Sequence, residues 1–175
     1  MDAPLQALLA ILAGTAALTD WKVRRIPNWL TIPSLVAALV LRGAFSGSIG
    51  VADGLKGAGL ALLVTLPFFV LRGLGGGDVK LLVAAGAILG PGRFLPVFAV
   101  NAVLGGVAAV LVLAGRGRWS QTFRNIGRIL ASIVRGRPPA QSGEGLSIDS
   151  PSAVTLPRGV IFAVTVLLFL ASGRW

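Results

Sequence analysis

The sequence predicts an all-α membrane protein with about six transmembrane helices and one cytoplasmic interfacial amphipathic helix. Of its 175 residues, 55% are hydrophobic and only 13% are charged, whereas a soluble domain carries about 25% charged residues. The apolar residues are gathered in long blocks between short charged patches, and are not scattered at the spacing of a water-soluble core. The lipid bilayer is therefore the expected solvent.

Six apolar blocks are candidate membrane spans, because a helix needs about 20 residues to cross the hydrocarbon and about 17 are tolerated. The first block is expected to be a retained helix, since Asp2 precedes it in place of the basic region of a signal peptide. The fourth block is short and is expected to extend beyond its apolar residues. The blocks are Pro4–Thr19, Trp29–Phe45, Leu55–Leu71, Val79–Leu89, Leu95–Ala114 and Arg158–Ser172.

The basic residues indicate how these spans are oriented. If residues 20–28, 72–80 and 115–158 share one side of the membrane, that side holds all but four of the 16 Lys and Arg residues. The positive-inside rule then makes this side cytoplasmic and places both termini outside. The four basic residues on the other side are Arg42, Lys56, Arg93 and Arg174.

The segment 115–157 between the fifth and sixth spans divides into two parts. Its first part has apolar residues at helical spacing with Arg residues largely elsewhere on the wheel, which predicts an amphipathic helix in the inner headgroup region. Residues 138–157 are rich in Pro, Ser and Gly and are expected to form a flexible linker. We therefore expect one membrane-embedded domain over residues 1–175. The periodic apolar residues are Trp119, Phe123, Ile126, Leu130 and Ile133.

The composition also limits partners and chemistry. The net charge of +10 flanks apolar blocks, so anionic lipid of the inner leaflet is the expected partner, and not nucleic acid, for which no docking module is present. The sequence contains no Cys and no His, which excludes disulfides and thiolate zinc sites. Any catalysis would have to use carboxylates, hydroxyls, amides or amines, and no metal or other cofactor is expected.

Two of the six acidic residues are candidates for catalysis. Asp20 closes the first span and Asp78 opens the fourth, so the predicted topology puts both at the same membrane face. Two nearby carboxyl groups cannot both ionise cheaply, so such a pair shares a proton and provides one base and one acid. The other four are expected to be solvated charges, with Asp53 in a short outer turn: Asp2, Asp53, Glu144 and Asp149.

A simpler interpretation is that each aspartate pairs with a neighbouring Lys22, Arg24 or Lys80 at the headgroup level. The glycines before Asp78 bear on this choice. Gly75, Gly76 and Gly77 would leave the backbone open to an extended substrate and permit unusual dihedral angles, although a glycine run is also typical of a flexible turn.

At these residues the chain resembles a known family. Gly75-x-Gly77-Asp78-x-Lys80 is similar to the Gly-x-Gly-Asp-x-Lys signature of type IV prepilin peptidases, which are membrane aspartyl proteases. The segment 20–28, beginning Asp20-Trp21-Lys22, resembles their first-aspartate segment. The short chain resembles the members that serve Flp or Tad-type pili.

The resemblance implies an aspartic endopeptidase of the bacterial inner membrane with Asp20 and Asp78 as its catalytic pair. It implies that Gly75, Gly77 and Lys80 support the motif or bind substrate, and that the substrate is a prepilin cleaved at the cytoplasmic face. Longer members carry a cysteine-based zinc domain and also N-methylate the new terminus. This chain has no such domain and no Cys, so the resemblance does not extend to methyl transfer.

Three further polar residues have alternative interpretations. Lys80 could position substrate or tune the carboxylates, or it could be an ordinary basic residue at a cytoplasmic helix end. Asn28, after Pro27, is expected to cap the second span. Asn101 is expected to bond across helices.

Two other classes of protein compete with a protease. A small transporter would place acidic residues deep within its spans and in broken helices. A non-catalytic subunit of a pilus or secretion assembly would keep its function when both aspartates are replaced.

Overall fold

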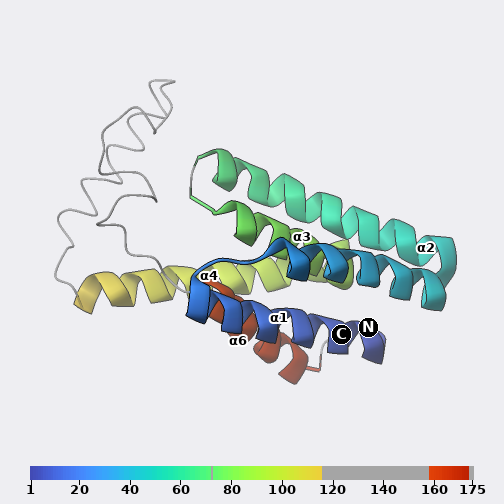
Figure 1. The fold of residues 1–175 in the computed structure, drawn as a ribbon, viewed down its shortest axis with the longest axis horizontal. Coiled ribbons are helices and arrows are strands. Elements are labelled where there is room, and N and C mark those ends of the chain that lie inside the picture. The colour runs from blue at the N-terminus through green and yellow to red at the C-terminus, as the bar shows by residue number, and fades with distance from the viewer. Residues whose placement is uncertain (72, 116–157, 174–175) are drawn as a thin grey trace.

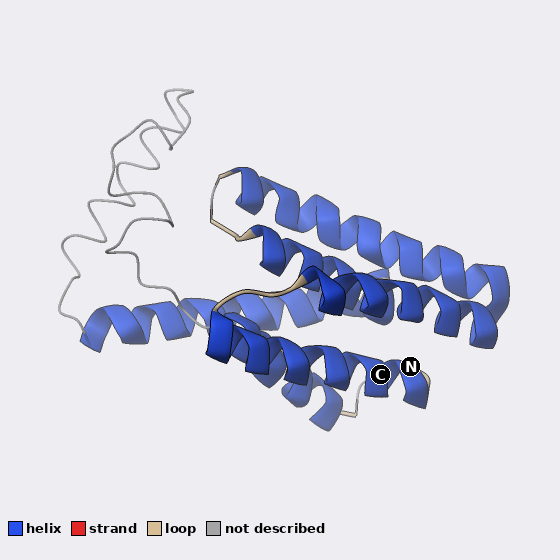
Figure 2. Cartoon of the chain, in the orientation of Figure 1, coloured by secondary structure: helices blue, strands red, loops and turns tan. Residues whose placement is uncertain are grey.

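The computed structural model describes residues 1–71, 73–115 and 158–173, and these residues form helices with no strand among them (Figure 2). The predicted all-α class is confirmed. The predicted amphipathic helix and linker fall almost wholly at residues 116–157, outside the described residues. The helices are α1 (Ala3–Val23), α2 (Asn28–Val70), α3 (Gly76–Leu89), α4 (Pro91–Gly115) and α6 (Arg158–Ala171).

Helix α2 folds back on itself. It has 43 residues, and Gly47 interrupts it with φ 58° and ψ −147°, a backbone conformation that glycine adopts readily because it has no Cβ. Figure 1 shows the part after Gly47 running back toward the end from which the first part came. The two halves are in contact, since Gly54 lies against the side chains of Leu39 and Arg42. They correspond to the predicted second and third spans.

The connection between these two halves differs from the prediction. We expected residues 46–54 to form an outer turn with Asp53 in it. The chain instead reverses at the single residue Gly47 and is helical on both sides of it, so Asp53 lies within the second half of α2. The sequence of this region is polar and glycine-rich, which is typical of a loop, but one glycine with positive φ is sufficient to reverse the chain.

The helices have the composition and length of a membrane protein. Among the described residues, α1, α2 and α4 are each long and apolar enough to cross a bilayer, and α6 is a shorter apolar helix. Large apolar side chains such as Trp21, Ile49, Leu63 and Leu111 are exposed on the outside, as expected of surfaces that face lipid. The count of six spans stays a prediction.

Helix α3 is the most buried helix of the described chain. All but two of its residues from Val79 to Leu89 are buried, and it contacts α1, α2 and α4. The core around it includes large side chains from three other helices. Because this core surrounds α3 on several sides, the first turn of α3 is held on a rigid support. Those core residues are Leu9 and Leu12 of α1, Phe94 of α4, and Phe162 and Val166 of α6.

Helix α6 packs along α1, and the two run in opposite directions (Figure 1). Their backbones are closest at Gly159, where an added Cβ would lie 2.6 Å from the carbonyl oxygen of Ala16 and 2.8 Å from Cβ of Asp20. Small residues permit such close helix contacts in membrane proteins. The first turn of α6 is therefore fixed against the last turn of α1, which carries Asp20.

Candidate active site

Asp20 is held by the start of α6. It lies in the last turn of α1, is only 8% exposed, and its Oδ2 accepts a hydrogen bond of 2.8 Å from the backbone N–H of Gly159. A carboxylate near the C-terminus of its own helix is unfavourable in the field of that helix, but the N-terminus of α6 attracts negative charge. The position of Asp20 is thus explained by α6 and not by α1.

Asp78 is held by its own helix and by an arginine. It is in the first turn of α3, where the helix dipole favours an acidic residue. Its Oδ2 accepts a hydrogen bond of 3.3 Å from the backbone N–H of Gly75, the N-cap residue. The same oxygen accepts a second hydrogen bond, of 2.7 Å, from Nη1 of Arg158. The side chain of Asp78 is 17% exposed.

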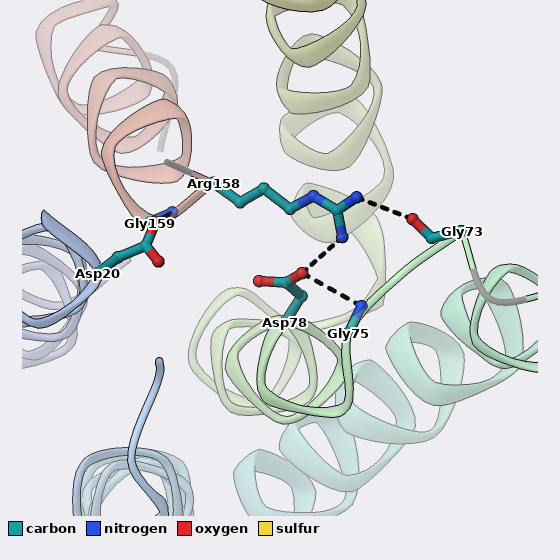
Figure 3. Close-up of polar contacts among 6 residues, drawn as sticks. All are labelled: Asp20, Gly73, Gly75, Asp78, Arg158 and Gly159. Carbon is teal, nitrogen blue, oxygen red and sulfur yellow. Dashed lines mark hydrogen bonds and ion pairs between the residues drawn. The ribbon is translucent and has the colours of Figure 1, made fainter. Parts of the chain in front are cut away.

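Arg158 joins three segments of the chain. It is the first residue of α6, its Nη1 binds Asp78 of α3, and its Nη2 donates a hydrogen bond of 2.9 Å to the carbonyl oxygen of Gly73, in the loop before α3 (Figure 3). Its side chain is 42% exposed. Arg158 therefore connects the loop before α3, the first turn of α3 and the start of α6.

The two aspartates are linked through consecutive residues of α6. Arg158 binds Oδ2 of Asp78, and Gly159 binds Oδ2 of Asp20. The hydrogen bonds that hold the two carboxyl groups are made to Oδ2 of each. In Figure 3 the second oxygen of Asp78 is directed to the side of the site where Asp20 lies. One oxygen of each carboxyl group is thus fixed by the first two residues of α6.

The predicted pairing of Asp78 with the neighbouring Lys80 is not what the described chain shows. Asp78 pairs with Arg158, a residue far away in the sequence. Lys80 instead donates a hydrogen bond of 2.9 Å to Oδ1 of Asn28, which connects α3 to the start of α2. The prediction that Asn28 caps α2 is wrong, because α2 has no side-chain cap and the amide oxygen of Asn28 binds Lys80.

The glycines of the motif have ordinary backbone conformations. Gly75 has φ −75° and ψ 152°, and the described glycines with positive φ are Gly47, Gly90 and Gly173. The expectation of unusual dihedral angles at residues 75–77 is therefore wrong. Their missing side chains matter more, since a Cβ on Gly77 would lie 3.3 Å from Cβ of Ile26.

A pocket of about 340 Å³ opens beside Asp78. Its polar lining comes from Asp78, Arg158, Gly73 and Asn101, and the remainder is apolar and is formed by α2, α3, α4 and α6. A mainly apolar concavity with a few polar groups is typical of a binding site for an apolar ligand or chain segment. The apolar lining includes Leu81, Leu82, Phe98, Ala102, Ile161 and Phe162.

Metal binding has little support among the described side chains. No three His, Cys, Asp or Glu residues come together in residues 1–71, 73–115 and 158–173.

Asn101, which we expected to bond across helices, has its Oδ1 3.3 Å from Oγ1 of Thr165 on α6. This prediction is confirmed.

The sequence did not reveal Arg158 and Gly159 as residues of the site. An arginine at the cytoplasmic edge of an apolar block satisfies the positive-inside rule, and that rule was a sufficient explanation of Arg158. Its only other signal was the glycine that follows it, which permits the close contact with α1.

These observations define a helical membrane protein with two aspartates, from separate helices, at one end of the helices. The chain matches the type IV leader peptidase family over residues 7–110, more than half of its length, and it belongs to that family. The predicted family is confirmed, and the family is one of peptidases. No match is found among curated proteins or solved structures. The matched residues include Asp20 and Asp78 but not α6.

Proposed function

We propose that the protein is an aspartic endopeptidase that removes the leader peptide from Flp-like type IV prepilins at the cytoplasmic face of the bacterial inner membrane. The observation that carries the proposal is that Asp20 and Asp78 come from different helices and are bound by two consecutive residues of α6. Membership of a leader peptidase family supports the reaction class and the class of substrate.

In the proposed mechanism, one water molecule binds between Oδ1 of Asp20 and Oδ1 of Asp78. One carboxylate takes a proton from this water as the water oxygen attacks the carbonyl carbon of the scissile peptide bond. The other group, as a carboxylic acid, gives its proton to the carbonyl oxygen. When the tetrahedral intermediate collapses, the C–N bond breaks, the leaving amine takes the proton that came from water, and a hydroxyl of the intermediate returns a proton to the other carboxylate, so no covalent enzyme intermediate forms.

The surroundings of Asp78 support binding of an extended segment followed by an apolar helix. Gly75 has no side chain beside Asp78, where an added Cβ would lie 3.4 Å from Oδ2, and this allows close approach by a peptide strand. The apolar pocket begins at the same aspartate. We propose that the cleavage junction lies along residues 73–77 and that the apolar helix of the precursor starts beside the pocket.

The charges beside the two aspartates support this membrane orientation. Lys22, Arg24 and Arg25 follow Asp20, and Arg72 and Lys80 flank Asp78 in the sequence, and basic residues of short loops favour the cytoplasmic side. These residues also attract anionic lipid of the inner leaflet. The basic leader of a precursor would approach the site from this side.

The test is co-expression of the protein with candidate prepilins, with cleavage scored as a decrease in precursor size. Asp20→Asn and Asp78→Asn should each abolish cleavage while the protein still inserts in the membrane. Asp2→Asn is the matched control, because Asp2 lies outside the site and its side chain forms no helix cap. Full processing by either variant would remove that aspartate from the mechanism, and full processing by both would favour a non-catalytic assembly subunit.

A further inference from the structure

Arg158 makes two hydrogen bonds that diverge from one guanidinium group. One goes to Oδ2 of Asp78, at 2.7 Å, and the other to the carbonyl oxygen of Gly73, at 2.9 Å (Figure 3). Guanidinium is planar, permanently charged and able to donate in two directions, whereas the ammonium group of lysine acts as a point charge. Arg158 can therefore fix the loop at Gly73 and the carboxylate of Asp78 at the same time.

The next residue along the chain fixes the other aspartate. Gly159 donates its backbone N–H to Asp20, and there is no space for a side chain at Gly159. Consecutive Cα atoms are about 3.8 Å apart, so the anchors of the two carboxyl groups are attached to the same helical turn. A shift of the first turn of α6 would move both anchors together.

Lys80, the basic residue of the motif itself, does not make the contact with Asp78 that Arg158 makes. Lys80, two residues after Asp78, uses its ammonium group to bind Asn28. In the described chain the cation bound to Asp78 is Arg158. It is also outside the segment that matches the family, residues 7–110.

We propose that Arg158 is a positioning residue for peptide cleavage. It holds Oδ2 of Asp78 and the loop at Gly73, so that the other oxygen of Asp78 is directed to the side on which Asp20 lies. Arg158 acts through Asp78 and does not itself attack the peptide bond. This inference rests on the proposed function, because it concerns how the same aspartates are oriented.

An opposite role is the main alternative for the same contact. If Arg158 blocked Asp78 until substrate displaced it, removing the guanidinium group would accelerate cleavage. A positioning role requires the reverse. Small displacements of catalytic groups can lower rates by about 100-fold, so the two roles differ in the sign of a large effect.

The experiment measures cleavage of a synthetic prepilin by purified protein in detergent, with kcat and KM determined separately. Arg158→Gln should lower kcat by roughly 10- to 100-fold and leave KM within about threefold, because substrate binding is retained. Arg158→Lys should be intermediate, since it keeps the charge but not the divergent pair of bonds. Lys22→Gln, which removes one positive charge from an exposed position on the same side, is the matched control and should keep the wild-type kcat.

Chemical rescue provides a readout that a general loss of structure would not give. Guanidinium ion at low, non-denaturing concentration should raise the kcat of Arg158→Ala, and should leave Lys22→Gln and Asp78→Asn unchanged. Wild-type or higher kcat for Arg158→Gln would overturn the positioning role. It would also be overturned if the Lys variant were as slow as the Gln variant and guanidinium had no effect.

Failure of the proposed function is distinguishable in the same assay. If Asp78→Asn cleaved like the wild type, the aspartic mechanism would be wrong and the role of Arg158 in it would be wrong too. If Asp78→Asn were inactive while Arg158→Gln matched the wild type, only the role of Arg158 would be wrong.

Discussion

An Arg–Asp pair lies at each end of α3, and the two arginines differ in exposure, while the aspartates differ in the opposite sense, with 44% for Asp53 and 17% for Asp78. Asp78 at its N-terminus binds Arg158, and Arg42 and Asp53 form a pair at its C-terminus. In both cases the charge nearest the helix has the sign that the helix dipole favours. The side chain of Arg42 is only 8% exposed, against 42% for Arg158.

The pair at the C-terminus of α3 completes the hydrogen bonding of the helix. Nε of Arg42 donates to the carbonyl oxygen of Ala87 at 2.8 Å, and Nη2 donates to that of Ile88 at 3.0 Å. The last carbonyls of a helix have no partner within the helix, so in the core they need donors from elsewhere. Asp53 then balances the charge of a buried guanidinium group.

The pair at the N-terminus of α3 has another character. Arg158 and Asp78 line a pocket and are accessible from it, and partly exposed ion pairs contribute little to stability. The arginine therefore serves the fold where it is buried against helix carbonyls, and the pair at the other end of α3 is available to a reaction because it lines a pocket. Two comparisons of substitutions test this difference between the two ends of α3, and two further experiments test the packing of α3 and α6.

The largest difference is expected in activity. Asp78→Asn should reduce kcat/KM by about 1,000-fold or more, because it removes an acid–base group. Asp53→Asn makes the same chemical change at the opposite end of α3 and should leave kcat/KM within about twofold, since its one amide oxygen can still accept from Arg42. The measurement is cleavage of a synthetic prepilin in detergent. Equal losses in the two variants would show that both effects come from misfolding.

The next difference is expected in stability. Arg42→Ala should lower the free energy of unfolding by about 3 kcal/mol, because two helix carbonyls and Asp53 lose their partner. Arg158→Ala should lower it by less than about 1 kcal/mol. Unfolding by titration with a denaturing detergent, followed by circular dichroism, measures both. A larger loss for Arg158→Ala would reverse the division between the two ends.

Close packing near the C-terminal end of α3 should also be sensitive. A Cβ on Gly86 would lie 2.5 Å from the carbonyl oxygen of Gly57 in α2, so Gly86→Ala must separate two backbones. We expect a loss of about 1 to 3 kcal/mol of unfolding free energy. Gly59→Ala is the control, since an added Cβ there meets nothing within 4 Å, and it should be neutral or slightly stabilising. If both variants were equally stable, this contact would not be a constraint.

The smallest effect concerns how α6 is held away from the site. Oγ1 of Thr165 and Oδ1 of Asn101 join α6 to α4 at 3.3 Å. A double-mutant cycle with Asn101→Ala and Thr165→Val should give a coupling free energy of about 0.6 kcal/mol, the usual size for such bonds in membranes. A coupling near zero would leave the first turn of α6 as the principal polar attachment of this helix.

The apolar blocks of the sequence predicted most of the helices, because a bilayer requires long apolar segments and does not hide them. The two aspartates were found for a related reason: acidic residues are rare in such a chain, so the few that border apolar blocks are conspicuous. The sequence also placed them at one face through the positive-inside rule. The end of α1, which carries Asp20, and the start of α3, which carries Asp78, lie at the same end of the helices, in agreement with that placement (Figure 1).

The remaining features depended on contacts between distant segments. Reversal at Gly47 was hidden because several nearby residues were equally suited to a turn. Asn28 had a local reason to cap its helix, but Lys80 of another helix provided a different partner. Arg158 had a sufficient explanation as a basic flanking residue, and only the packing of α6 against α1 brought it to Asp78.

The shortness of α3 has a consequence for the depth of Asp78. Its 14 residues give a length of about 21 Å, less than the roughly 30 Å thickness of bilayer hydrocarbon. A helix of this length cannot reach both surfaces of the hydrocarbon, and because α3 is enclosed by α1, α2 and α4, other helices and not lipid cover its sides. If the missing length falls at the N-terminal end of α3, Asp78 meets an incoming apolar helix at the depth where that helix begins, and the bond is hydrolysed without extracting the helix from the membrane.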